Sequence, residues 1–560
     1  MTTQEELQRR IRELEKEVAH LHSQIKHQQY GLVWLDVPEA FDKESENKIP
    51  ILEEVPEMAI HHDDGKPTHI LIEGDNYHAL TCLNYTHKGK VDVIYIDPPY
   101  NTGSDGFTYK DKRFLKEYPD GSELPKNHPL RHSIWLSFMD KRLRLAKELL
   151  SDKGIIFISI DDNEDAALKL LCDKIFLREN KVADVIWQSR KSVSNDTFIS
   201  NNHNYTLIYF KDSTKWKKGD LNLPASLDKF ENPDNDPRGA WVADPFDAPN
   251  IRPNLTYPII NPNNGKFYLP PEGRCWRTTE EEYNKMLADG RIVFGKRGLT
   301  KPQLKRYIND AELKGQTPIS IWNDVETTTD GTKMLDGIIG KNRFKNPKPL
   351  GLLNKILLMA SQKDSVILDF FAGSGTTLHA TMNLNAEDGG HRQCILCQIN
   401  EANICTDVTY ERNKRVMNGY TDSKSNHVEG LGNSLKYYRT AFVGKNKPKD
   451  ATDEDKVTLS KKAGCLLALA ENTLYEQKST DFYQIYSDEQ GHTTAIYFQE
   501  DGEEYGNFLK EVEGIKGKRT VYVFSWGTGE EFRSDFETMK DVMVKSIPQP
   551  ILDIYKSLNQ

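Results

Sequence analysis

Apolar residues are spaced along this chain in ways that predict an alternation of helices and strands. Residues 3–28 carry an apolar residue at alternating steps of four and three, which is the a/d pattern of a coiled coil: Leu7, Ile11, Leu14, Val18, Leu21 and Ile25. Short apolar runs predict buried strands at 69–72, 91–96, 154–160, 366–368 and 394–399. Apolar stripes through 133–150 and 350–361 predict helices between them. This alternation is typical of a mostly parallel, doubly wound α/β sheet.

The alternation is interrupted by a long segment rich in Pro, Asn, Asp and Gly, which predicts an inserted domain. Strand-like runs near 494–498 and 521–524, followed by a helix after Pro550, predict a small C-terminal α/β domain. The predicted organisation is an N-terminal amphipathic or coiled-coil helix in 1–35, core halves at 36–185 and 346–445, the inserted domain at 186–345, and a linker with the C-terminal domain at 446–560.

Composition narrows the class of protein. A chain of 560 residues is too long for a single core. It has 28% charged and 37% hydrophobic residues, no apolar run long enough for a membrane span, and no signal-peptide pattern at its start, so we expect a cytoplasmic protein without a membrane partner. Cys394 and Cys397 form a CxxC inside an apolar run; we interpret them as core thiols and predict no metal site.

The net charge of −10 is unevenly distributed. Residues 186–345 hold 24 basic and 20 acidic residues, whereas residues 451–560 hold 12 basic and 20 acidic ones. Six cations fall within sixteen residues that contain no acid, and such a cluster can pair with phosphates or form a solvated surface: Arg291, Lys296, Arg297, Lys301, Lys305 and Arg306. We predict these six as DNA contacts.

The run at 91–96 delivers a tetrapeptide, Asp97-Pro98-Pro99-Tyr100, suited to chemistry on an amino group of a base. An exocyclic amine is a poor nucleophile, because its lone pair is delocalised into the ring. The Asp97 carboxylate and the Pro98 carbonyl can accept its hydrogens and hold the lone pair toward a methyl donor. Pro98 and Pro99 restrict the backbone in advance, and Tyr100 can stack on a base that has left the helix.

A second motif, Asp369-Phe370-Phe371-Ala372-Gly373-Ser374-Gly375-Thr376-Thr377, comes 272 residues after Asp97. Gly373 and Gly375 lie between a predicted strand and a helix, where glycine lets backbone N–H groups approach a ligand. Position 378 is leucine, so the third glycine of the dinucleotide fingerprint is missing. The string suits S-adenosylmethionine, with Asp369 on the methionine ammonium and Thr376 or Thr377 on its carboxylate.

With these motifs in this order, the chain resembles the β-class amino DNA methyltransferases, and among them the modification (Mod) subunit of type III restriction–modification systems. Matching stretches run through most of residues 30–445, including 71–76, 97–103, 158–164, 346–349 and 369–377. The resemblance implies a circularly permuted class I S-adenosylmethionine-dependent methyltransferase fold, in which 186–345 is the target-recognition domain.

The resemblance also implies the remaining cofactor contacts. Asp75 would accept a hydrogen bond from the amine of the cofactor adenine, with Asn76 beside it. Lys348 and Phe371 would border the cofactor pocket. Members of the family often place an acid after the strand that follows the glycine loop, to hold the ribose hydroxyls. This chain has Gln398 and Glu401 there, and the sequence leaves open which of them contacts the ribose.

The leading hypothesis is site-specific methylation of adenine N6 in double-stranded DNA by base flipping. Cytosine-N4 methylation shares the mechanism, although serine often replaces Asp97 in that group. Methylation of RNA or of a protein amide is a further alternative, although those relatives more often carry asparagine in place of Asp97 and lack so large an insertion. A recognition subunit without activity is the non-enzymatic alternative, and the intact motifs argue against it. The a/d stripe and the resemblance predict a homodimer, and the resemblance allows a helicase–nuclease restriction subunit as a further partner.

Overall fold

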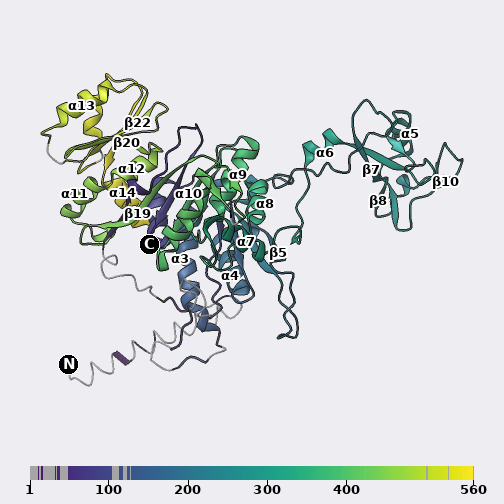
Figure 1. The fold of residues 1–560 in the computed structure, drawn as a ribbon, viewed down its shortest axis with the longest axis horizontal. Helices are drawn as coiled ribbons and strands as arrows, with labels where there is room; N and C mark the ends of the chain where they lie inside the picture. Colours follow the sequence, from purple (N-terminus) through teal and green to yellow (C-terminus); the bar gives the residue numbers. More distant parts are fainter. Residues whose placement is uncertain are drawn as a thin grey trace. The chain divides into compact units, whose positions relative to one another are not determined.

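The computed structural model describes residues 48–558 apart from 104–112, 118–122, 126–127, 423, 500–501 and 528, together with residues 10, 11, 14, 16, 32 and 34–37. Residues 10, 11, 14 and 16 are helical, and the rest of the helix predicted at 3–28 lies outside the described residues. The chain divides into two compact units: one is Met1–Trp216 with Ile319–Gln560, and the other is Lys217–Pro318 (Figure 1).

A ten-stranded sheet, as far as the chain is described, organises the first unit. In spatial order its strands are β1 (Ile49–Glu54), β19 (Ser434–Val443), β2 (Thr68–Glu73), β16 (Gln393–Gln398), β15 (Val366–Asp369), β3 (Val91–Ile96), β4 (Leu150–Ile160), β6 (Asn204–Phe210), β5 (Lys181–Trp187) and β14 (Ile321–Trp322). Neighbours from β19 to β4 are parallel, and β6 is antiparallel to β4. The predicted, mostly parallel α/β sheet is confirmed, and β15 pairs with β3 although the two strands are far apart in the sequence.

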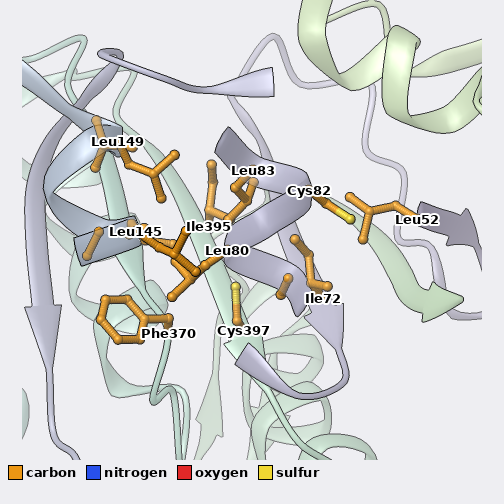
Figure 2. Packing of buried hydrophobic residues seen from close by; sticks show 14 of the residues in the cluster. Leu52, Ile72, Leu80, Cys82, Leu83, Leu145, Leu149, Phe370, Ile395 and Cys397 are labelled. Atoms are coloured by element: carbon orange, nitrogen blue, oxygen red, sulfur yellow. The ribbon is translucent and has the colours of Figure 1, made fainter. Parts of the chain in front are cut away.

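Both faces of this sheet are covered. Successive strand residues point to opposite faces, yet neighbours such as Val93 and Ile94 are both fully buried. On one face Ile72, Ile395 and Cys397 pack with Leu80 in the core shown in Figure 2. Cys394 is also fully buried in β16, and burial raises the pKa of both thiols. The two cysteines therefore lie in the core, as predicted.

Helices connect the strands and form two groups. The helix α2 contacts α3, α12 (Gly464–Glu471) and α14 (Gln549–Leu558), whereas α8 contacts α9 and α7 contacts α10. The bounds are α2 (Asn76–Thr86), α3 (Ser133–Leu149), α4 (Asp165–Cys172), α7 (Thr328–Ile339), α8 (Leu350–Ala360), α9 (Thr376–Asp388) and α10 (Glu411–Asn418). In the part of the chain that the structure describes, no helix has the length and apolar character to cross a membrane.

The C-terminal residues form a five-stranded sheet in the order β20-β21-β22-β23-β24. Its elements are α11 (Asp453–Lys462), α12 (Gly464–Glu471), β20 (Tyr475–Ser479), β21 (Tyr483–Ser487), β22 (His492–Tyr497), α13 (Tyr505–Gly514), β23 (Lys518–Phe524), β24 (Val542–Ile547) and α14 (Gln549–Leu558). Leu466 and Ile551 join the core of the large sheet, so this part belongs to the first unit. The predicted linker is short, since α11 begins at Asp453 and Asp455 binds the Lys445 backbone N–H at 2.7 Å.

The second unit is smaller than the segment predicted at 186–345. Its elements are β7 (Trp241–Pro245), β8 (Asp247–Pro249), β9 (Ile259–Ile260), β10 (Phe267–Tyr268), β11 (Arg274–Trp276), α5 (Glu280–Ala288), β12 (Ile292–Val293), β13 (Gln303–Tyr307) and α6 (Ile308–Lys314). It has its own core, around Phe246 and Trp276. The flanking residues extend the large sheet as β5, β6 and β14. The apolar run at 204–210 forms β6, a strand that was not predicted because the whole of 186–345 was assigned to the inserted domain.

Candidate active site

The strand β3 positions the first motif, because its carboxyl end delivers Asp97 to the edge of the sheet where ligands of parallel α/β folds bind. One Asp97 carboxylate oxygen accepts from the Tyr100 hydroxyl at 2.7 Å, and the other accepts from the Lys348 ammonium at 2.5 Å. The Asn204 amide donates to the Tyr100 hydroxyl at 3.3 Å. Burial, followed by the Asp97 charge, raises the pKa of Tyr100 well above its ordinary value, so its hydroxyl stays protonated and donates.

Buried side chains hold the backbone of this motif in place. The indole N–H of fully buried Trp135 donates to the Pro99 carbonyl at 2.7 Å. Asn101 adopts a left-handed φ of 57°, and its amide donates to buried Glu164 at 2.6 Å. The sequence reasoning missed Trp135, Asn101 and Glu164 as supports; the signal was available in Asn101, since asparagine tolerates left-handed backbone better than most residues. Pro98 lines a cavity at this edge of the sheet, and its carbonyl remains a proposed acceptor for a hydrogen of the target amine.

The second motif forms a tight turn between β15 and α9. Asp369 is 2% exposed; it accepts from the Thr377 hydroxyl at 2.5 Å and from the Phe371 backbone N–H at 3.0 Å. Burial is the largest cause that raises the pKa of Asp369, to about 7, and its two hydrogen bonds lower it. Gly373 and Gly375 have φ of 51° and 71°, in the left-handed region that favours glycine.

A buried arginine stabilises the start of α9. Arg412 is 1% exposed, and its guanidinium donates to the Thr376 hydroxyl at 2.6 Å and to the Ser374 hydroxyl at 3.2 Å. Burial lowers the pKa of Arg412 to about 9. The Thr376 hydroxyl also donates to the Lys348 carbonyl at 3.2 Å, which ties the glycine turn to the residue that contacts Asp97.

Asp75 caps α2, which begins at Asn76 beside the same turn. The Asp75 carboxylate accepts from the Tyr77 backbone N–H at 2.7 Å and pairs at 3.1 Å with Arg142, whose side chain is fully buried. Asn76 accepts from Arg142 and donates to the Phe370 carbonyl at 2.8 Å. Arg142 was missed by the sequence reasoning. Arg142 fixes the direction of the Asp75 carboxylate. The contact of Asp75 with the cofactor adenine stays a prediction.

One cavity of about 1220 Å³ brings the two motifs together. Its lining includes all fifteen residues predicted for catalysis or cofactor binding except Gly375: Asp75, Asn76, Asp97, Pro98, Pro99, Tyr100, Lys348, Asp369, Phe371, Gly373, Thr376, Thr377, Gln398 and Glu401. His203 and Asn204, to which no role was assigned from the sequence, also line it. Gln398 accepts from the Gly373 N–H at 2.7 Å, so it supports the turn, and Glu401 remains the proposed ribose contact.

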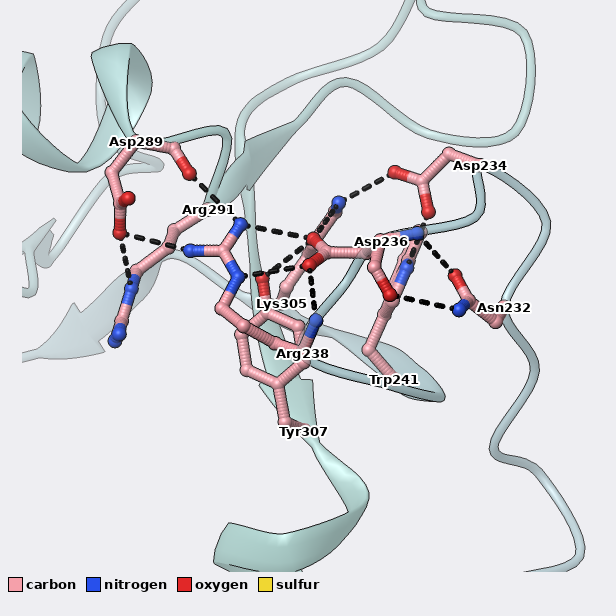
Figure 3. Close-up of polar contacts among 9 residues, drawn as sticks. All are labelled: Asn232, Asp234, Asp236, Arg238, Trp241, Asp289, Arg291, Lys305 and Tyr307. Carbon is pink, nitrogen blue, oxygen red and sulfur yellow. Dashed lines mark hydrogen bonds and ion pairs between the residues drawn. The ribbon is translucent and has the colours of Figure 1, made fainter.

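Four of the six predicted DNA contacts pair with acids in the second unit. Arg291 pairs with Asp289 at 2.8 Å, Lys301 with Asp247 at 3.0 Å, and Arg306 with Asp244 at 3.0 Å. Lys305 is 7% exposed and reaches Asp234 and Asp236, as Figure 3 shows. The prediction of a phosphate contact is therefore wrong for Lys305, because the fold surrounds it with carboxylates that are distant in sequence.

Lys296 and Arg297 are exposed and make no ion pair among the described residues. We expect the double change Lys296→Ala and Arg297→Ala to lower the slope of log affinity for DNA against log salt by about 2, since each phosphate contact contributes about one counterion. The slope is measured by fluorescence anisotropy. Lys285→Ala, which removes an exposed lysine paired with Glu281 at 2.9 Å, is the control. An unchanged slope in the double variant would mean that Lys296 and Arg297 do not contact phosphates and are only solvated surface residues.

The mostly parallel α/β sheet, with the Asp97 motif and the glycine turn at the carboxyl ends of adjacent strands, has the architecture of a methyltransferase. A family model described as DNA methylase matches residues 91–409, more than half of the chain. The chain belongs to this family of DNA methylases.

The relatives are modification enzymes by name. The StyLTI Mod subunit of a type III restriction-modification enzyme from Salmonella typhimurium (strain LT2) is 40% identical over 363 residues, which are 60% of this chain and 54% of the relative. The type II methyltransferase M.KpnI from Klebsiella pneumoniae is 31% identical over 391 residues, 66% of this chain and 90% of that protein. The M1.HpyAVI–SAM complex is 15% identical with a TM-score of 0.27, covering 62% of this chain and 98% of that chain. The chain spans about half the length of the Mod relatives that it matches.

Proposed function

We propose that this chain is a site-specific DNA methyltransferase that transfers a methyl group from S-adenosylmethionine to N6 of a flipped adenine. The observation that supports it best is the placement of Asp97 and the glycine turn in one cavity, at the ends of the paired strands β3 and β15. The similarity to Mod subunits favours adenine over cytosine N4 as the acceptor.

The residues of the cavity fit this cofactor. The turn at Gly373 leaves little room for a side chain, since an added Cβ would lie 3.3 Å from the Phe344 ring. Buried Asp369 offers a carboxylate to an ammonium group, and Phe371 offers an aromatic surface. S-adenosylmethionine, when bound, supplies an electrophilic methyl group.

The residues around Asp97 would orient the target amine. Each carboxylate oxygen has two lone pairs, so Asp97 can accept an amine hydrogen while Tyr100 and Lys348 hold it in place. The Pro98 carbonyl would accept the second hydrogen. The amine proton becomes acidic only after the methyl group has transferred, so Asp97 acts by position and charge and need not be a strong base.

The pKa of Asp369 gives a pH prediction. Below about pH 7 the carboxyl is protonated, and a bound ammonium favours the ionised form, so binding must release a proton. We expect the affinity for the demethylated cofactor to fall about tenfold per pH unit below pH 7 and to level off above it. Calorimetry between about pH 5.5 and 7.5 measures this, and Asp369→Asn should flatten the dependence. A pH-independent affinity in the unchanged protein would remove Asp369 from the ammonium site.

We further propose that the second unit, Lys217–Pro318, recognises the DNA sequence, with Lys296 and Arg297 on phosphates. Its separate core supports this, because such a unit can vary without disturbing the large sheet. A homodimer and a helicase–nuclease subunit are the partners that the Mod similarity suggests.

The function is tested by incubating the purified chain with DNA and labelled cofactor. The label should appear on adenine N6; label on cytosine would select the alternative.

A further inference from the structure

The loop between β5 and β6, residues 188–203, presents the most exposed large apolar side chains of the described chain. Phe198 and Ile199 have relative exposures of 110% and 88%, and Val193 follows at 71%. Exposed apolar residues that occur singly are ordinary, but three within seven residues of one loop mark a contact surface. Figure 1 shows this loop extending away from β5.

Hydrogen bonds fix the base of the loop and leave the side chains at its tip exposed to solvent. The Arg190 N–H donates to the Asn202 carbonyl at 3.2 Å, the Asn202 amide donates to the Ser192 carbonyl at 2.9 Å, and the Ser194 N–H donates to the Ser200 hydroxyl at 2.9 Å. These bonds run across the loop like the start of a hairpin. Phe198 and Ile199 lie beyond them, so the backbone holds both side chains away from the core.

The base of this loop belongs to the candidate active site. Ser189, Arg190, Asn201 and His203 line the cavity that contains Asp97, and Asn204 donates to the Tyr100 hydroxyl. The register pairs Ile160 with Tyr205, which brings the loop out at the sheet edge where the parallel strands end. A substrate bound in front of Asp97 would therefore meet this loop.

We propose that Phe198, with Ile199 beside it, is a wedge that enters the DNA base stack at the target site and fills the space that the flipped base leaves. The proposal rests on the proposed function. A base must leave its stack to reach the cavity, and proteins that open DNA insert apolar side chains between bases. Every base has an aromatic face, so the wedge helps to open the duplex without reading its sequence.

Charge favours DNA over a protein as the occupant. Arg190 and Lys191 are both exposed at the base of the loop, where backbone phosphates would lie if the tip entered the stack. The remaining tip residues are small and polar, and Asp196 is the one acid between Arg190 and His203. A protein-binding loop would need a larger continuous apolar area than two adjacent side chains provide.

The test compares two duplexes that carry the methylated sequence, once that sequence has been mapped. One is fully paired, and the other has an abasic site opposite the target base, so that less pairing must be broken. Single-turnover methyl transfer is measured for the unchanged chain, Phe198→Ala, Phe198→Leu and Ile199→Ala. Met543→Ala, which removes a 53% exposed side chain from β24, is the control. Full exposure of Phe198 means that its removal should leave the melting temperature unchanged.

We expect Phe198→Ala to slow transfer at least about tenfold on the paired duplex and less than about twofold on the abasic one, because the abasic site already removes the pairing that the wedge helps to break. Phe198→Leu should lie between, Ile199→Ala should show a smaller loss of the same kind, and Met543→Ala should match the unchanged chain. Equal rates for Phe198→Ala and the unchanged chain on the paired duplex, or equal losses on both duplexes, would overturn the wedge. An unchanged chain that methylates neither duplex would instead overturn the proposed function, and the wedge with it.

Discussion

Asp97→Asn is expected to lower the rate of methyl transfer at least about a thousandfold, while cofactor and DNA binding stay close to those of the unchanged chain. The substitution keeps the shape of the side chain and replaces one acceptor oxygen with a donor. In the structure one oxygen faces the Tyr100 hydroxyl and the other faces the Lys348 ammonium, both of which donate. An amide nitrogen at either position would oppose a donor, so the side chain would turn away or lose its hold on the target amine.

The matched control is Asp152→Asn. Asp152 is exposed near the amino end of β4, away from the strand ends that meet at the cavity, and its change should leave transfer within about twofold. Transfer rates come from radiolabelled cofactor under single-turnover conditions, and binding comes from anisotropy and calorimetry. Near-normal transfer by Asp97→Asn would reject the amine-orienting mechanism. A parallel loss of DNA binding would assign Asp97 to binding and not to chemistry.

Gly375→Ala is expected to weaken cofactor binding about a hundredfold, because a shift of the turn by about 1 Å misplaces the groups around it. Gly375 caps α9 with a φ of 71°, and an added Cβ would collide with the Asn413 amide and lie 3.2 Å from the Thr409 carbonyl. Asn413 is fully buried, and its amide donates to the Gly375 and Thr409 carbonyls, so relief of the clash requires the Asn413 side chain to leave these bonds or the turn to shift. The strained backbone itself should cost about 1–3 kcal/mol of folding free energy.

Gly389→Ala separates these two effects. Gly389 lies at the other end of α9 with a φ of 67°, and an added Cβ there meets nothing within 4 Å. It should show the same kind of backbone cost in thermal unfolding, with cofactor affinity within about twofold of the unchanged chain. The two variants are compared by calorimetry with the demethylated cofactor. Equal affinities in both variants would mean that the packing around Gly375 does not shape the cofactor site.

Local pattern was sufficient to predict the central part of this fold. The apolar runs that end at Asp97 and Asp369 are buried strands, and each residue lies at the carboxyl end of its strand. The order of the motifs supported the resemblance to a circularly permuted methyltransferase fold, and in the structure β3 and β15 are neighbours, with Val93 paired with Ile367. Both inferences depend on residues close in sequence or on a fold-wide rule, which is why a single chain was enough.

Contacts between residues far apart in sequence were the part that the pattern could not supply. Lys305 belongs to a cluster with no acid within its sixteen residues, yet Asp234 and Asp236 approach it from across the unit. Arg142 lies within the helix predicted at 133–150, and its partner Asp75 is 67 residues away. Charge in a sequence window does not show whether an ion is paired, because pairing depends on tertiary packing.

The most direct test of the whole account is base-resolved sequencing of DNA methylation in a host that expresses either the unchanged chain or Asp97→Asn. We predict N6-methyladenine at one defined sequence with the unchanged chain and none at that sequence with the variant. Methylation of cytosine at a defined sequence would replace adenine as the acceptor. Identical methylation patterns in the two hosts would contradict the assignment of Asp97, and with it the central claim about this cavity.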